Sequence, residues 1–180
     1  MKRIAQFLTS NPVAASLRCR RGGTALEFAM VGPLFLLLLL TVVELGYLLF
    51  VQSVLSGASR EAARMIRTGQ VQSAPDPMTA FQNQLCLTVN LILPCKKVVY
   101  EAFVFNSFGS VALPPPKRDG AGNLQSNGFT PGGAGQIVAV RVQYPYTFIV
   151  PMVGQYLSPG GLGSMLVSST IVFRNEPFGS

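Results

Sequence analysis

The N-terminal third of the chain carries a continuous hydrophobic pattern that passes into a periodic one. From Ala29 to Val51 the sequence is apolar apart from one charge, Glu44, and a few small or weakly polar residues. As a helix, these 23 residues would reach roughly 35 Å, enough to cross a hydrocarbon core of about 30 Å. A buried core helix is the alternative, whereas a removable secretory signal would have a shorter apolar core, about 7–15 residues. Pro33 predicts a kink in this segment.

Beyond the continuous run, apolar residues recur with helical spacing and arginines occupy another face. Gly69 is the predicted stop, so we expect one helix of about 45 residues. Its membrane part is predicted over residues 23–52, and its amphipathic continuation over residues 53–69. The amphipathic stripe would pack on a domain or against a neighbouring helix. The apolar positions are Val51, Leu55, Ala58, Ala62, Met65 and Ile66, and the basic ones are Arg60, Arg64 and Arg67.

The remaining residues, 70–180, are predicted to form an exported domain with strands. Three runs rich in Val, Ile, Tyr and Phe favour extended structure: "KKVVYEAFVF", "QIVAVRVQYPYTFIV" and "SMLVSSTIVFRNEP". Pro145 suggests a break or an edge in the second run. The earlier stretch "MTAFQNQLCLTVNLILPC" is either a short helix or a helix running into an extended segment. The fold class is therefore α+β, with a small antiparallel sheet of about three strands.

A segment rich in Pro, Gly and Asn, residues 114–135, separates the first two strand runs. It exceeds the usual loop length, and such segments are either functional or disordered. We expect disorder here.

The basic excess lies almost entirely in the leader, residues 1–22. The formal charge is +7, but from Gly23 onward nine Lys and Arg face seven Asp and Glu, a net of +2. A nucleic-acid-binding face would need basic residues gathered on the folded part, so nucleic acid is not an expected partner. Basic residues before a membrane segment instead predict a cytoplasmic N-terminus and an exported C-terminal domain.

The residue types argue against catalysis and metal binding. Histidine, the commonest general base and a frequent metal ligand, is absent from the sequence. The acids beyond the helix are isolated, and "GGAGQIV" lacks the Gly-Lys-Ser/Thr of a phosphate loop. We therefore expect no enzyme activity, no cofactor and no metal site.

Two of the three cysteines, Cys86 and Cys95, fall in the predicted exported domain, whereas Cys19 lies among the leader arginines. Two thiols in an oxidising compartment favour a disulfide. Closing so short a loop contributes roughly 2.5–3 kcal/mol on the chain-entropy model. Two free buried thiols are the alternative.

The start of the helix resembles a known processing site. Gly22 is followed by four residues and then by Glu27-Phe28, and this spacing before a long apolar helix is similar to that of type IV prepilins and pseudopilins. The doubled glycine allows a cut after Gly22 or after Gly23. The longer stretch "ALEFAMVGPLFLLLLLTVVELGYLLFVQSVLSGASREAAR" resembles TadE-like proteins, minor pseudopilins of the tight-adherence (Flp) pilus machinery. The residues that carry this resemblance are Glu27-Phe28-Ala29, Pro33, Glu44-Leu45-Gly46, Ser59 to Arg64 and, more loosely, Phe173 to Pro177.

This resemblance implies a pilin-like fold and a structural role. A prepilin peptidase would remove the leader on the cytoplasmic side, and the mature protein would stay in the inner membrane with its C-terminal domain in the periplasm. Other pseudopilins, the pilin, and an inner-membrane assembly platform with its ATPase would be its partners, together with membrane lipid. Two alternatives stay open, namely an uncleaved single-pass envelope scaffold and a membrane-tethered periplasmic ligand-binding or hydrolytic domain.

Two acids of the helix are the expected contact residues. Glu27 follows the cut site by one helical turn and, as the resemblance implies, would pair with the new N-terminal amine of a neighbouring subunit. Capping of the helix N-terminus is the simpler interpretation of this acid. Glu44 lies far inside the predicted membrane segment, where an ionised acid costs about 2.5–3.5 kcal/mol on insertion scales. It is predicted to make a polar contact with a partner helix, or to be protonated or to reach the periplasmic interface.

Overall fold

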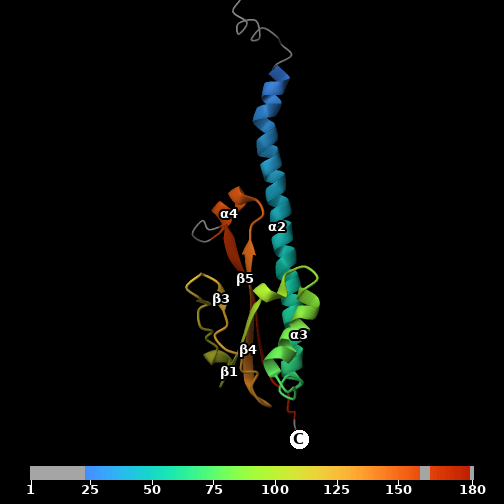
Figure 1. Ribbon diagram of the computed structural model, residues 1–180, viewed down its shortest axis with the longest axis vertical. Helices are drawn as coiled ribbons and strands as arrows, with labels where there is room; N and C mark the ends of the chain where they lie inside the picture. The colour runs from blue at the N-terminus through green and yellow to red at the C-terminus, as the bar shows by residue number, and fades with distance from the viewer. Residues whose placement is uncertain (1–22, 159–162, 179–180) are drawn as a thin grey trace, which may run out of the picture. The chain divides into compact units, whose positions relative to one another are not determined.

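A computed structural model describes residues 23–158 and 163–178 of the chain. The chain divides into two compact units, with the boundary between Val43 and Glu44. The helices are α2 (Gly23–Arg67), α3 (Pro77–Val89) and α4 (Pro151–Leu157), with the short 3-10 helices η2 (Cys95–Lys97) and η3 (Phe108–Ser110). The strands are β1 (Val99–Phe105), β2 (Lys117–Arg118), β3 (Leu124–Gln125), β4 (Ile137–Thr147) and β5 (Ser164–Arg174) (Figure 1).

Helix α2 has the 45 residues that the hydrophobic pattern predicts, and it continues through Pro33. It ends where expected, because Gly69 adopts a positive φ of 81° and its N–H donates to the carbonyl of Ile66. A side chain at Gly69 would be strained in that conformation and would also meet the ring of Phe178, 2.5 Å from the position of an added Cβ. Glycine is therefore needed at this helix end.

The first unit, described from Gly23 to Val43, is a helix whose apolar side chains are mostly exposed. Leu34, Phe35 and Leu38 each show 60% or more of their surface. Such exposure is unfavourable in water and ordinary in lipid. Helix α2 is long and apolar enough to cross a membrane.

The second unit is built around an antiparallel sheet in the order β1-β4-β5. The three strands coincide with the three runs predicted from the sequence, which confirms the α+β fold with one long helix and a small sheet. Pro145 does not break β4; it pairs with Leu166 of β5, beyond the last β1 pair, Val99 with Gln143. A residue without an N–H is tolerated there, since β1 no longer runs alongside.

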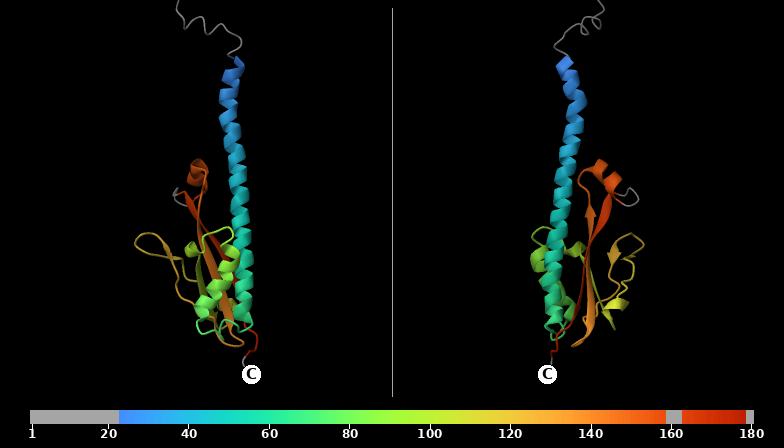
Figure 2. Two further views of the ribbon diagram at one scale, coloured as in Figure 1. Left: turned by 45° about the vertical axis from the view of Figure 1, so that its right-hand side comes forward. Right: turned by 180° about the vertical axis from the view of Figure 1, so that it is seen from behind.

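The helices cover one face of this sheet. In both views of Figure 2 the C-terminal part of α2 and α3 lie on the same side of the strands. Alternate residues of β4, namely Val138, Val140 and Val142, are fully buried in the core on this side. The helix residues that join them are Val51, Leu55, Ala58, Ala62 and Ile66 of α2 and Phe81, Leu85 and Val89 of α3.

A buried ion pair on the opposite face orders the Pro/Gly-rich segment. Glu101 of β1 and Arg141 of β4 are register partners, and the Arg141 Nε donates to the Glu101 carboxylate at 2.8 Å. Arg141 also donates to the carbonyl of Pro114 at 2.7 Å, and the Asn127 backbone and side chain donate to Glu101 at 2.9 and 2.8 Å. The segment 114–135, for which the sequence favours disorder, is thus bound by the ion pair at two points, Pro114 and Asn127.

The undecided stretch before β1 forms α3 and then a turn. Asp76 caps α3, accepting from the backbone N–H of Met78 and Thr79. The hydroxyl and backbone N–H of Thr79 bind the Asp76 carboxylate, and these bonds lower the pKa of Asp76. The structure joins Cys86 of α3 to Cys95 of η2 in a disulfide, with 5.6 Å between the Cα atoms.

The packed unit includes residues that the sequence predicts as part of the membrane helix. Glu44 and Val51 are buried and Leu48 packs against the core, so the stretch 44–52 belongs to the second unit. The sequence placed these residues in the membrane segment because they are apolar. Part of that apolar character instead serves the contact with the sheet.

Candidate functional site

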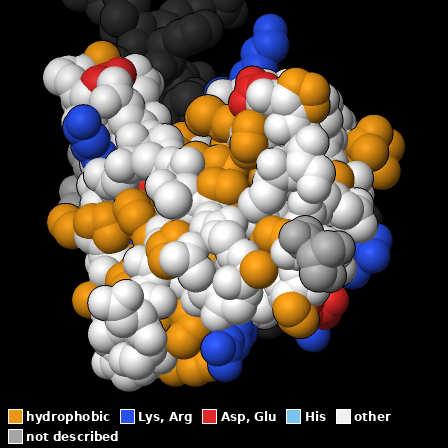
Figure 3. Space-filling view, turned by 90° about the horizontal axis from the view of Figure 1, so that it is seen from below, with side chains coloured by type: hydrophobic (Ala, Val, Ile, Leu, Met, Phe, Trp, Pro, Cys, Tyr) orange, Lys and Arg blue, Asp and Glu red, His pale blue; other side chains and the backbone are white. Residues whose placement is uncertain are grey.

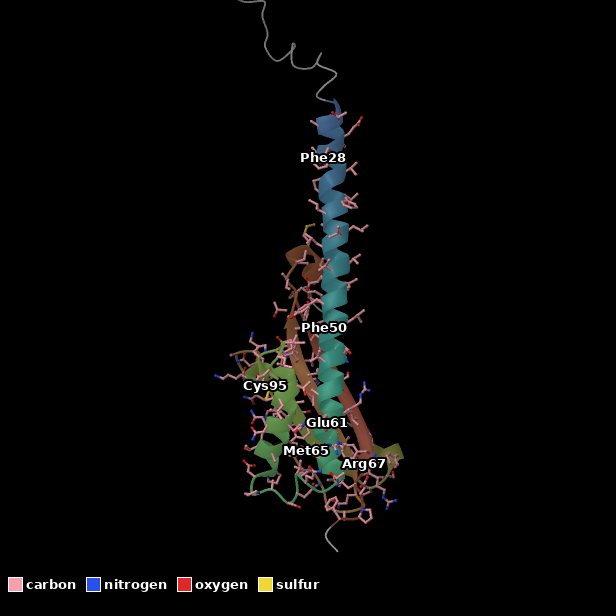
Figure 4. The ribbon with its side chains drawn as sticks, turned by 90° about the vertical axis from the view of Figure 1, so that its right-hand side faces the viewer. Phe28, Phe50, Glu61, Met65, Arg67 and Cys95 are labelled. Atoms are coloured by element: carbon pink, nitrogen blue, oxygen red, sulfur yellow. A yellow bond between two sulfur atoms is a disulfide. The ribbon has the colours of Figure 1, made fainter. Side chains whose placement is uncertain are left out.

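The residues of the predicted processing site lie at the start of α2. Gly22 is outside the described residues, and Gly23 is the first residue of the helix. Glu27 is exposed, and Phe28 shows 77% of its surface (Figure 4). Phe28 contacts Gly32 one turn later, its ring lying 3.5 Å from where a Cβ would stand. Within the described residues Glu27 makes no hydrogen bond or ion pair, so its carboxylate is open to an outside group.

Glu44, in contrast, is bound by its own chain. Only 3% of its surface is exposed, and its carboxylate accepts from the Tyr146 hydroxyl. The backbone N–H of Ile149 donates to it at 3.1 Å, and that of Val150 at 3.1 Å. These donors lie more than 100 residues further along the chain. The acid is therefore satisfied inside the domain.

The donors come from the connection between β4 and β5, which contains α4 (Figure 1). Val150 is the N-cap residue of α4 but has no side-chain oxygen to offer the exposed amides of the helix start. Glu44 supplies the missing acceptor from another helix. Pro151 follows at the first helical position, where its fixed φ suits the start of a helix.

Aromatic packing fixes the third donor. The Tyr146 ring lies 6.1 Å from that of Tyr47 and 5.3 Å, edge-on, from that of Phe148, measured between centroids. Burial, and then the hydrogen bond to Glu44, raise the pKa of Tyr146, so its hydroxyl stays protonated and donates at neutral pH. One signal for this pairing is visible in the sequence, namely an acid in an apolar helix with no basic residue near it, but no pattern identifies its partners.

The far end of α2 is tied to the C-terminal segment. Arg67 pairs with Glu176 at 3.1 Å, and the backbone N–H of Glu176 donates to the Arg67 carbonyl at 2.9 Å. Arg64 pairs with Glu61 along the helix surface at 2.8 Å. These are exposed pairs that stabilise little by themselves. Their arrangement places the arginine face of α2 outside the core.

Most of this helix matches the model of a known protein family. Residues 22–64 match the model of the TadE family, described as TadE-like protein. The match confirms the resemblance drawn from the sequence and is consistent with a TadE-like pilus protein. It begins at Gly22 and spans both acids, Glu27 and Glu44. No curated protein and no solved structure matches the chain.

Proposed function

We propose that this protein is a minor pseudopilin of a tight-adherence (Flp) pilus assembly system. In this proposal a prepilin peptidase cuts the chain after Gly22 or Gly23. The mature protein is then anchored in the inner membrane by the first half of α2, with its C-terminal domain in the periplasm. The observation that carries the proposal is the family match over residues 22–64, which starts at the expected cut site.

The distribution of exposed side chains supports this assignment. The stretch 23–43 exposes leucine, valine and phenylalanine, whereas the later half of α2 buries its apolar face against the sheet. A helix divided in this way holds a folded domain at a membrane. The protein's action would then be structural, exerted through helix packing and domain surfaces rather than through catalysis.

Glu27 is the residue we assign to subunit contact. Cutting before Gly23 creates an α-amino group with a reference pKa of about 7.7–8.0, mostly charged at neutral pH. That amine lies one turn from Glu27 of its own chain, and the exposed carboxylate is free to receive the amine of a neighbour. In a bundle of subunit helices from which water is excluded, such a pair would set the axial register between neighbouring subunits, because leaving either charge buried without its partner costs free energy. Other pseudopilins and the pilin are the proposed neighbours, with the inner-membrane platform and its ATPase driving assembly.

The proposal is tested by mapping the N-terminus of the protein isolated from its native membrane. A mature N-terminus at Gly23 or Thr24 is expected, and Gly22→Leu should retain residues 1–22. A native protein that keeps its leader would refute processing and favour the uncleaved scaffold.

The role of Glu27 needs a second measurement. Glu27→Val should be inserted and cut nearly as well as the wild type, yet should fail to support pili. Glu27→Asp is the matched control, since it keeps the charge. If capping of the helix were its whole role, the Val and Asp variants would assemble alike, and normal piliation by Glu27→Val would contradict the subunit contact.

A further inference from the structure

The turn between β4 and β5 exposes a cluster of apolar side chains. It belongs to a stretch of 32 residues, 142–173, that contains no Asp, Glu, Lys or Arg. Four large apolar side chains of this turn, which we call the α4 patch, show from 47% to 84% of their surface. They are Ile149, Met152, Tyr156 and Leu157. Met152 and Tyr156 stand four residues apart, so they share one face of α4.

Glu44 fixes where this patch lies. Its carboxylate binds the backbone N–H of Ile149, a member of the patch, and that of the adjacent Val150. Glu44 also directly follows the stretch 23–43, whose 21 residues reach roughly 32 Å as a helix and match a hydrocarbon core of about 30 Å. The α4 patch is therefore held at the residue where the chain leaves its membrane-crossing stretch.

The neighbouring part of α2 exposes apolar side chains to the same extent. Leu49 shows 69% of its surface and Phe50 shows 49%. The exposed residues that follow on α2 are Ser53, Gly57, Arg60, Glu61, Arg64 and Arg67, so large apolar exposure on α2 ends at Phe50. Phe50 lies six residues, or about 9 Å, beyond Glu44. That rise is close to the depth of the polar interfacial layer on one side of a bilayer, about 5–8 Å.

We propose that the α4 patch contacts the outer interface of the bilayer, as a second membrane contact beside the helix. Lipid is the occupant that these observations favour, because the patch is bound to Glu44, the residue that directly follows the membrane-crossing stretch, and carries no charge. An exposed tyrosine among aliphatic side chains is typical of the membrane–water interface. The contact sets the orientation of the domain on the membrane surface. This inference rests on the membrane anchoring in the proposed function.

The opposite end of the domain provides the control. Phe105 of β1 pairs with Ile137, ten residues of β4 away from Thr147, a distance of about 34 Å along the strand. Phe108 follows Phe105 and shows 59% of its surface. Figure 3 views the molecule from below, the end away from α4, where charged side chains of both signs lie among scattered hydrophobic ones.

The test uses tryptophan fluorescence, since the sequence contains no tryptophan. Three variants of the full chain would be placed in nanodiscs containing phosphatidylcholine brominated on its acyl chains. Tyr156→Trp reports the patch, Phe35→Trp reports the membrane-crossing stretch, and Phe108→Trp reports the distant end. All three replace an exposed aromatic side chain, so folding should be preserved. Iodide in the buffer quenches only tryptophan that faces water.

We expect the bromolipid to quench Phe35→Trp and Tyr156→Trp, and iodide to quench Phe108→Trp alone. Quenching of Tyr156→Trp by iodide to the extent seen for Phe108→Trp would overturn the inference. Shielding of Tyr156→Trp from both quenchers would also overturn it, in favour of a second protein chain on the patch. If Phe35→Trp is not quenched by bromolipid, the membrane anchoring itself fails. If bromolipid quenches Phe35→Trp but not Tyr156→Trp, anchoring stands and the patch contact fails.

Discussion

Replacing Glu44 should release the β4–β5 connection from α2. The carboxylate holds one hydroxyl and two backbone amides, and it is almost fully buried. A hydrogen bond to a charged group contributes about 1.5–3 kcal/mol, and a buried donor left without an acceptor costs a similar amount. Because the amide of Ile149 is only partly buried and water can reach it, we expect Glu44→Leu to lower the local opening free energy by about 3–5 kcal/mol.

Glu44→Gln should give an intermediate result. The amide oxygen can still accept from the two backbone N–H groups, and the amide nitrogen can donate to the Tyr146 oxygen. Charge-assisted hydrogen bonds are roughly twice as strong as neutral ones, so about half of the loss is expected.

Hydrogen exchange of the full chain in detergent, followed by mass spectrometry, measures this effect. The peptide covering residues 146–157 should exchange faster by a factor on the order of 10²–10⁴ in Glu44→Leu. Glu27→Leu is the matched control, since it removes an exposed acid from the same helix and should leave that peptide unchanged. Exchange in Glu44→Leu within about twofold of the wild type, a difference of about 0.4 kcal/mol, would refute the interpretation of Glu44 as an internal clamp.

Three further predictions concern the domain, each checked by denaturation of the full chain in detergent. Replacing Cys86 and Cys95 together by serine should lower the free energy of unfolding by about 2.5–3 kcal/mol. The same denaturation midpoint for the double variant, the reduced wild type and the oxidised wild type would contradict this. Glu101→Leu should lower the free energy of unfolding by about 3–5 kcal/mol, because it leaves Arg141 buried and unpaired. Adding Arg141→Met to this variant should restore part of the lost stability. A double variant less stable than Glu101→Leu would contradict this explanation. The pKa of Tyr146 is raised in the folded state, so the stabilisation that its protonated hydroxyl provides is intact below about pH 10 and is lost as the pH rises further. The free energy of unfolding should therefore fall less steeply above that pH in Tyr146→Phe than in the wild type. Parallel plots of this free energy against pH for the two proteins would exclude the linkage.

The elements that the sequence predicted well are those whose signal is local. A helix of 45 residues with a glycine stop follows from a pattern within one segment, and so do three strands rich in β-branched and aromatic residues. The ordered state of the segment 114–135 depends instead on Glu101 and Arg141, which are 40 residues apart. An acid and an arginine in two apolar strands were visible in the sequence, but their pairing depends on strand register.

The side chains of α2 that pack on the sheet also depend on residues far along the chain. Residues 44–52 are apolar, and the hydropathy of a helix does not distinguish a face that meets lipid from one that meets a sheet. Val51 is buried in the core, whereas Phe50 beside it is half exposed. Only the presence of β4 and β5 along this part of α2 separates the two environments. The predicted strand run ended at Val150, three residues beyond the end of β4 at Thr147, because "TFIV" is β-branched and aromatic, and the sequence pattern did not predict the helix α4 that follows.

The two acids of α2 have different partners, and this difference bears on assembly. An acid in an apolar helix needs a polar partner, and Glu44 obtains its partners from Tyr146 and the start of α4. A neighbouring subunit need not supply any. Glu27 has no such group among the described residues of its own chain, so a partner must come from solvent, a headgroup or a second subunit. Loss of Glu44 should therefore first disturb the domain and its orientation, whereas loss of Glu27 should leave the domain intact and affect only association. Hydrogen exchange and piliation, both measured on Glu44→Leu and on Glu27→Val, separate these effects. Unfolding of the domain by Glu27→Val would contradict a role of Glu27 in association alone.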